Sequence, residues 1–359
     1  MALTLHGTVS DNTAVLDRRN AKPLIINGDM AVDQRNSGAS VTAVNNAYQV
    51  DRWRTFSGAA SKFTVQQQTS VVPPFFKNAQ KITSSSAYSA AAGEAFALNT
   101  PIEGGSIANL GFGTANAKYV TLSFLVYSSL TGTFSGSLFN SAWNRSYPFT
   151  YSVSSANTWT TIVVAIPGDT SGTWLTTTGT GLVVNFDIGS GSNWKGSANA
   201  WGSAAYTGVA GSVSIVGTSG ATFYVTGVQL EMGQFDANSI APFQHESFGD
   251  SLMRCERYCK AITKEANYAP VMLAHGVTAD VCRGAYFFQT PMRAAPSFTH
   301  TGNIIRSFDT ATAASSATAV SSRFSHSIDW TASGLFAANE GILMTFNTTA
   351  ASLIYSAEL

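Results

Sequence analysis

The sequence predicts an all-β protein built from an antiparallel β-sandwich, one connecting helix and a second, smaller β-sandwich domain. Its 359 residues suggest two domains. Most of the chain consists of segments in which apolar and polar residues alternate, separated by Gly, Ser and Asn turns. No helical pattern alternates with these segments, which favours antiparallel pairing over a parallel sheet.

The expected organisation has an arm, two β domains and a linker. Residues 1–22 are polar, and we interpret them as an N-terminal arm that orders against a partner; a frayed terminus is the alternative. The first sandwich is expected over residues 23–246. The linking helix follows over 247–262, and the second β domain over 263–359.

Several segments of the first domain have strong strand patterns. Residues 119–130 place Val120, Leu122, Phe124 and Val126 on one face. Residues 161–166 are apolar on both faces, which predicts a central strand. Residues 223–231 are expected to form one unbroken alternating strand that Gly233 ends. The remaining predicted strands are 62–69, 80–85, 94–102, 181–189 and 213–219.

The linking helix is predicted from apolar residues at helical spacing, with Asp250 or Ser251 as the N-cap. The apolar stripe consists of Leu252, Cys255, Tyr258, Cys259 and Ile262. We expect this stripe to pack on protein. The chain has three cysteines, and buried, reduced thiols are the favoured interpretation for all of them.

Two short motifs near the start of the first domain predict structure rather than chemistry. Asn27-Gly28-Asp29 has the composition of a turn. In the second motif Trp53 is expected in the core, with Asp51 and Arg52 in structural hydrogen bonds. Asp29 could help to hold a structural calcium, but no Asp-rich loop accompanies it, so no metal site is expected.

Composition argues against several classes of partner. Only 11% of the residues are charged, against roughly 25% in ordinary soluble proteins, and the formal net charge is +0. This balance favours neither nucleic-acid binding nor attachment to an anionic membrane. No segment is apolar and long enough to insert into a bilayer, and the N-terminus lacks signal-peptide features, so synthesis in a cytoplasm is expected.

The motifs of common enzymes do not occur. The Gly-rich segments 111–116 and 189–193 have no following helix that would make a phosphate site. The histidines are scattered singly, and no HExxH or GxSxG pattern is present. We therefore expect no catalytic residues, no cofactor and no enzymatic activity.

Two loop segments are rich in aromatic residues with few aliphatic neighbours. Exposed rings can stack on the apolar faces of sugars while neighbouring Asn, Ser and Arg groups bond the hydroxyls. The alternative is that the rings pack at the ends of the sandwich or against another subunit. The candidate residues are Trp143, Arg145 and Tyr147 in segment 139–151, and Trp194, Trp201 and Tyr206 in segment 188–208.

Five motifs resemble, in the same order, segments of bacteriophage tail-fibre and related virion proteins. They are INGDMAVDQR at 26–35, YQVDRW at 48–53, GVQLEMG at 227–233, RCERYC at 254–259 and TPMRAAPSF at 290–298. The region 59–226 also resembles the jelly-roll fold of carbohydrate-binding modules. The resemblance therefore implies a jelly-roll-like antiparallel β-sandwich for the first domain.

The resemblance also implies a function and partners. It favours a homotrimeric fibre or tail-tip subunit of the virion that contacts other virion proteins through residues 1–22 and binds host-surface glycan. The alternative is a capsid decoration or head-fibre protein with a purely structural role; an enzyme acting on cell-wall or capsular sugar is the third possibility. Glycan binding predicts a solvent-facing aromatic cleft distal from the N-terminal arm, and the structural role predicts that Trp194 and Trp201 are buried against neighbours.

Overall fold

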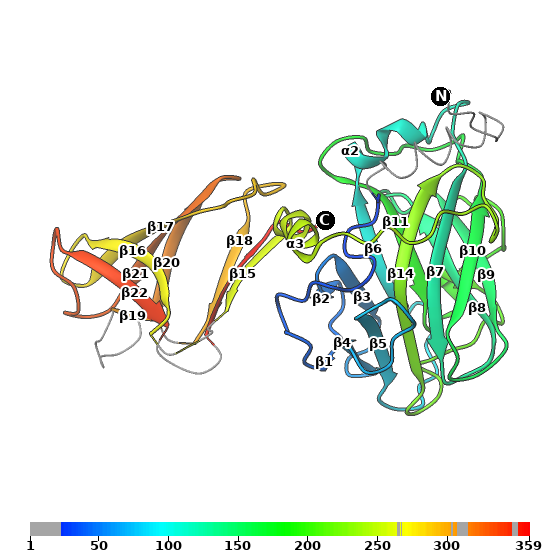
Figure 1. Cartoon of the computed structure of the whole chain (residues 1–359), viewed down its shortest axis with the longest axis horizontal. Helices are drawn as coiled ribbons and strands as arrows, with labels where there is room; N and C mark the ends of the chain where they lie inside the picture. The colour runs from blue at the N-terminus through cyan, green and yellow to red at the C-terminus, as the bar shows by residue number, and fades with distance from the viewer. Residues whose placement is uncertain (1–22, 264–265, 267, 303, 307–314, 347–350) are drawn as a thin grey trace, which may run out of the picture. The chain divides into compact units, whose positions relative to one another are not determined.

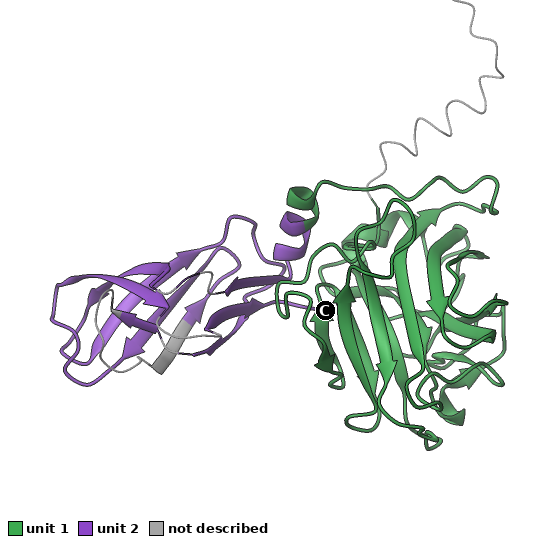
Figure 2. Ribbon diagram, turned by 60° about the horizontal axis from the view of Figure 1, so that its bottom comes forward, with its two compact units in different colours: residues 1–251 green, residues 252–359 purple. Residues whose placement is uncertain are grey.

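The computed structural model describes residues 23–263, 266, 268–302, 304–306, 315–346 and 351–359, so the predicted arm over 1–22 lies outside the described residues. The chain forms two compact units, the first ending at Ser251 and the second beginning at Leu252 (Figure 2). This division falls inside the segment 247–262 that was expected to link the domains. Both units are built almost entirely from antiparallel strands.

The first unit is a sandwich of two six-stranded sheets (Figure 1). In spatial order, sheet A contains β1 (Val41–Thr42), β4 (Phe63–Gln68), β5 (Ala79–Ser84), β14 (Thr222–Met232), β7 (Val120–Ser128) and β10 (Thr160–Ile166). Sheet B contains β2 (Ala47–Val50), β3 (Trp53–Ser57), β6 (Phe96–Glu103), β11 (Thr180–Asp187), β8 (Gly132–Phe139) and β9 (Ser146–Val153). The chain crosses repeatedly between the sheets, which confirms the jelly-roll-like antiparallel sandwich.

Short elements fill the connections of the first unit. The single-turn helix α2 (Gly104–Ile107) and the 3-10 turn η1 (Ala108–Leu110) follow β6. A second 3-10 turn, η2 (Ser192–Trp194), precedes the small parallel pair β12 (Lys195–Gly196) and β13 (Gly208–Val209).

The core lies between the two sheets and follows the alternation of the strands. The prediction for β7 is confirmed, because Val120, Leu122, Phe124 and Val126 are all buried in this core. Sheet B contributes large side chains from the opposite side, including Phe134, Phe149 and Phe186. The side chains that alternate with these on sheet B face outward, away from the core.

Strand β14 does not keep the unbroken alternation that was predicted. Its register against β7 shifts between Thr226 and Gln229, and Gly227 has a φ of 60°. This β-bulge lets Val228 and Leu230 continue the core face that Phe223 and Val225 begin. A side chain at Gly227 would also approach Leu125 to 2.7 Å, so glycine is required there by both conformation and space.

Two further predictions for the first unit are wrong. Residues 160–166 form an edge strand rather than a central one, since β10 pairs only with β7. Its apolar composition reflects partial burial of Ile162 and Val164 against the core. Residues 213–219 form turns, in which Ile215 and Val216 reach the core without strand pairing.

The motif at 26–35 packs on β3 as expected of a structural element. The buried Asn27 side chain donates to the carbonyls of Val32 and Asp51, both at 2.8 Å, and the backbone carbonyl of Asn27 accepts from the Trp53 indole at 2.9 Å. Trp53 is fully buried in the core, as predicted. The Asp51 carboxylate pairs with Arg35 at 3.1 Å, and Arg52 donates to the carbonyl of Pro101 at 2.6 Å.

The second unit contains a three-stranded and a six-stranded antiparallel sheet. The first has the order β15 (Cys259–Thr263), β23 (Ser352–Ser356) and β18 (Ser297–Thr301). The second has the order β19 (Ile304–Arg306), β22 (Gly341–Phe346), β16 (Pro270–Gly276), β17 (Val281–Phe287), β21 (Ser325–Thr331) and β20 (Ser315–Ser321). Side chains from both sheets share one core that includes Trp330, Met344 and Tyr355, so this unit is the smaller sandwich.

The predicted helix is only half as long as expected. Helix α3 spans Phe248–Glu256, with the Ser247 hydroxyl accepting from the Asp250 N–H at 3.1 Å near its start. Cys259 and Ile262, which the helical stripe included, belong instead to β15, which pairs along its whole length with β23. Tertiary pairing thus overrides the apolar spacing. Cys255, Cys259 and Cys282 are buried and form no disulfide, as predicted.

Candidate functional site

The aromatic segment after β11 crosses the outer face of sheet B as a flap, defined here as residues 189–213. Backbone groups of the flap bond to side chains of the strands beneath it. Asn185 of β11 donates to the Thr207 carbonyl at 2.9 Å, and the Val209 N–H donates to the Ser135 hydroxyl of β8 at 3.1 Å. The predicted loop therefore lies against the sheet.

A buried ion pair fixes the flap to β11. Lys195 pairs with the Asp187 carboxylate, whose side chain is fully buried while that of Lys195 is 12% exposed. The same carboxylate accepts from the Ser190 N–H at 2.9 Å and the Ser135 hydroxyl at 3.3 Å. The Ser135 hydroxyl also lies within hydrogen-bond distance, 2.8 Å, of the Ser212 hydroxyl near the far end of the flap. These bonds tie both ends of the flap to one carboxylate.

A cleft opens beside the start of the flap, and it contains two of the predicted aromatic residues. Its volume is about 330 Å³, and it is lined by Asn45, Asn46, Phe56, Gly58, Gly93, Ala95, Trp143 and Trp194. The Trp143 and Trp194 rings meet edge to face at 6.2 Å. Trp194 is held by its indole N–H, which donates to the Gly93 carbonyl at 2.9 Å. The walls are therefore aromatic, with uncharged amides at the rim.

Trp143 extends from the β8–β9 turn back over sheet B. Its backbone is left-handed, with a φ of 58°, and 39% of the residue is exposed. The ring contacts Phe139 of β8 at 4.9 Å and Phe56 of β3 at 5.3 Å. Because β6 and β11 lie between β3 and β8, the indole crosses above both of these strands.

Two predicted aromatic residues pack within the sandwich and do not line this cleft. Trp201 is half-buried, its indole N–H donates to the Pro167 carbonyl at 2.8 Å, and its ring contacts Tyr147, Phe112 and Trp174. Tyr147 is 5% exposed, and burial raises the pKa of its hydroxyl. These positions correspond to the packing alternative.

Arg145 and Tyr206 also have structural surroundings. Arg145 donates two hydrogen bonds to Asp169, both at 2.7 Å, and these bonds raise the pKa of its guanidinium. Tyr206 is half-buried against the backbone of Gly196 and Gly202. Of the six predicted residues, the structure thus brings Trp143 and Trp194 together in the cleft. Sequence reasoning missed Phe56 of the unpredicted β3, and Asn45 and Asn46 of the turn before β2.

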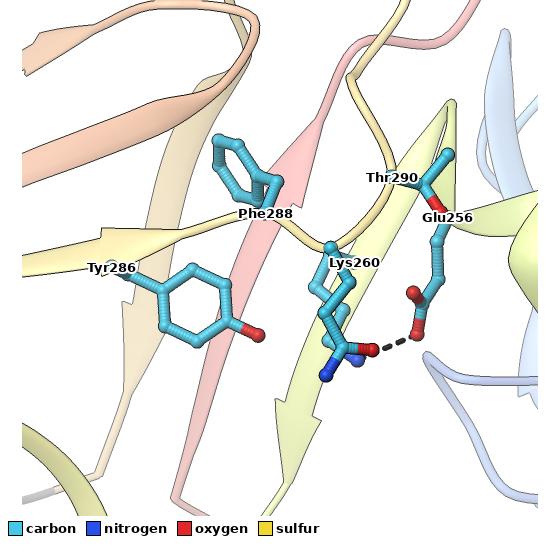
Figure 3. Close-up of a pocket in the computed structure, with 6 residues that line it drawn as sticks. Glu256, Lys260, Tyr286, Phe288 and Thr290 are labelled. Carbon is cyan, nitrogen blue, oxygen red and sulfur yellow. Dashed lines mark hydrogen bonds and ion pairs between the residues drawn. The ribbon is translucent and has the colours of Figure 1, made fainter.

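A small depression lies near the end of α3 in the second unit. Figure 3 shows it between Glu256, Lys260, Tyr286, Phe288 and Thr290. Lys260 and Glu256 form an ion pair at 2.6 Å across it. Because these charges already satisfy each other and little space remains, this depression is not a candidate site.

The described residues contain no group of three or more His, Cys, Asp or Glu side chains arranged to hold a metal ion. Asp29 itself is partly buried, and desolvation raises the pKa of its carboxyl group. No helix in the described part of the chain is both long and apolar enough to span a membrane.

No protein-family model and no curated protein matches the chain. Among solved structures, the enzymatically active domain of bacteriophage CBA120 tailspike protein 4 aligns with a TM-score of 0.32 and 12% identity over 58% of this chain and 21% of that one. A putative sugar-binding protein from Bacteroides thetaiotaomicron aligns with a TM-score of 0.33 and 14% identity, over 59% and 100%. TmCBM61, solved with galactotriose, gives 0.30 and 9%, over 59% and 99%. Likenesses this weak carry no argument about function.

Proposed function

We propose that this chain is a non-enzymatic bacteriophage fibre or tail-tip subunit that binds host-surface glycan. It would be made in the host cytoplasm and reside in the virion. The observation that carries the proposal is the cleft, in which Trp143 and Trp194 meet beside Asn45 and Asn46. The virion assignment draws its support from the five ordered motifs, including the buried network around Asn27.

The cleft has the chemistry that a neutral sugar requires. Aromatic rings remove the apolar face of a sugar ring from water, a gain of about 25 cal/mol per Å² of apolar area. Amide side chains at the rim can both donate to and accept from hydroxyl groups. One cleft of this size would bind weakly, but three copies on one fibre raise the effective concentration and so the strength of attachment.

Replacing Trp194 with alanine should weaken glycan binding at least about tenfold while the protein stays folded, because the ring is half-buried and lines the cleft. Glycan-array binding and particle adsorption are the measurements, with melting as the control for folding. Trp201→Ala is the matched variant. It should lower the melting temperature instead, since Trp201 packs against the core. Equal binding by wild-type protein and the Trp194 variant would contradict the proposed site.

The structural alternative is favoured by one observation, the packing of Trp201 and Tyr147 inside the first unit. A capsid decoration or head-fibre protein needs a rigid sandwich but no ligand. A protein that is folded and assembled, yet binds no glycan in an array and leaves particle adsorption unchanged when Trp194 is replaced, would establish this role over receptor binding.

The proposed fibre subunit is expected to be a homotrimer. Large apolar side chains are exposed on the second unit, with Leu273 at 76%, Phe287 at 74% and Phe324 at 60%. Closed symmetry would repeat this apolar area and cover it with neighbouring subunits. Multi-angle light scattering at micromolar concentration should give three times the monomer mass of 37.8 kDa. A stable monomer would contradict the expectation.

A further inference from the structure

A row of polar side chains crosses four adjacent strands on the outer face of sheet B. The strand register pairs Arg54 of β3 with Asn99 of β6, Asn99 with Asn185 of β11, and Asn185 with Ser137 of β8. All four residues are buried; Asn99, Asn185 and Ser137 have no exposed surface and Arg54 has 8%. An outer sheet face would ordinarily place such groups in water.

Apart from Arg54, each residue of the row has one polar atom without a hydrogen-bond partner among the described residues. These atoms are Asn99 Nδ2, Asn185 Oδ1 and Ser137 Oγ. The other amide atoms are used, since Asn99 Oδ1 accepts from Arg54 at 2.6 Å and Asn185 Nδ2 donates to the Thr207 carbonyl at 2.9 Å. A donor, an acceptor and a hydroxyl therefore follow one another on three neighbouring strands, and each such group destabilises the fold while it is unsatisfied.

The row lies next to the aromatic cleft. Phe56, which lines the cleft, is the next residue after Arg54 on the same face of β3, and the Arg54 guanidinium lies 5.3 Å from its ring. Trp143 passes over β6 and β11, which bear Asn99 and Asn185. The flap covers the opposite side of the row, where the Asn185 side chain donates to the Thr207 carbonyl.

We propose that Asn99, Asn185 and Ser137 form the inner, hydroxyl-binding floor of the cleft, and that Trp143 rotates outward to admit a neutral sugar. This inference rests on the proposed function. A hydroxyl group between the first two residues would accept from Asn99 Nδ2 and donate to Asn185 Oδ1. A second hydroxyl would lie between Asn185 and Ser137. Sugars carry such groups on neighbouring carbons, whereas apolar ligands would leave the row unsatisfied.

The charges of the site favour a neutral sugar over an acidic one. The residues that line the cleft have no ionisable side chain. Arg54 is the single cation of the row and already donates to Asn99. An acidic sugar would lose its hydration on entering the buried row, and only this engaged guanidinium could offset that loss.

The test is Ser137→Ala in the full chain, because this change removes one unpartnered hydroxyl and nothing else. Titration would use cellotetraose, maltotetraose and galactotriose as neutral probes and trigalacturonate as the acidic probe. We expect a neutral probe to bind about three- to tenfold more weakly to the variant. The melting temperature should stay the same or rise, since a buried unsatisfied group has been removed.

Tyr151→Phe is the matched control. Its hydroxyl is also buried and has no partner in the described part of the chain, but it belongs to the core side of sheet B, where the ring packs on Phe124. This variant should gain stability and keep the affinity of the wild type. If Ser137→Ala keeps the wild-type affinity while Trp194→Ala binds more weakly, the proposed hydroxyl-binding floor is wrong and the proposed function still stands.

Two further outcomes complete the test. If no probe binds wild-type protein, the proposed function fails and the inference fails with it; if trigalacturonate binds more tightly than the neutral probes, the neutral floor is wrong. Fluorine-labelled tryptophan gives the second readout, with the Trp143 signal assigned by Trp143→Phe. That signal should shift when a neutral probe binds, and a shift confined to Trp194 would contradict the movement of Trp143.

Discussion

Replacing Lys195 with methionine is expected to lower the free energy of unfolding of the first unit by about 3–5 kcal/mol, because the change leaves the Asp187 carboxylate buried without its cation. The flap loses its anchor in the same step, so glycan binding at the cleft should fall as well. Denaturant unfolding followed by tryptophan fluorescence measures the first effect, and titration with neutral oligosaccharides measures the second.

Two controls distinguish the cost of leaving a buried charge unpaired from the cost of losing an ion pair. Arg283→Met breaks the Arg283–Asp329 pair of the second unit, in which the arginine side chain is 51% exposed, and it should change stability little. The double variant Lys195→Met with Asp187→Leu removes both buried charges and should recover much of the lost stability. A Lys195 variant as mild as the Arg283 variant would show that the flap does not depend on this pair.

Replacing Tyr355 with alanine should destabilise the second unit by about 3–5 kcal/mol, since it removes a fully buried ring from the centre of the core. The ring contacts Tyr286, Phe288, Phe298 and His326 at centroid distances of 5.0–5.4 Å. Its strand, β23, lies between β15 and β18, so the loss also loosens the three-stranded sheet. Thermal unfolding of the full chain would show the second unit melting first.

Tyr355→Phe provides the control for that experiment. The Tyr355 hydroxyl is buried and has no hydrogen-bond partner among the residues that the structure describes, and burial raises its pKa well above the ordinary value. Phenylalanine keeps the ring contacts and removes the unsatisfied group, so stability should be equal or higher. A large loss in this variant would mean that the hydroxyl, and not the ring, stabilises the core.

The strands that could be predicted from the sequence are those with apolar residues at every second position or in a continuous run, and they include β6 and β11, which are buried on both faces. β7 was predicted because Val120, Leu122, Phe124 and Val126 recur at every second position. β8 was missed because the flap buries its outer face too, and that face includes small polar residues such as Ser135 and Ser137. The alternation that signals a strand is weak in such a segment, and coverage by a distant segment cannot be seen locally.

The same reasoning explains the partial prediction of the site. Trp143, Trp194 and Trp201 all lie among Gly, Ser, Asn and Ala, so their local sequences do not distinguish them. Tertiary contacts do: the Trp201 indole reaches Pro167 and enters the core, whereas the Trp194 indole bonds to Gly93 at the edge of the cleft. Asn99 and Asn185 were not predicted because they come together only through strand pairing.

The bulge at Gly227 determines which side chains of β14 face the core. Inserting one residue between Val228 and Gln229 would turn Leu230 to the solvent side and Gln229 toward the core. Gln229 also fastens the segment that leaves the sandwich, accepting from the Gln244 N–H at 3.0 Å. A slip of one position would therefore transfer that attachment to the wrong face of sheet A, and insertions should be tolerated in the turns flanking β14 but not within it.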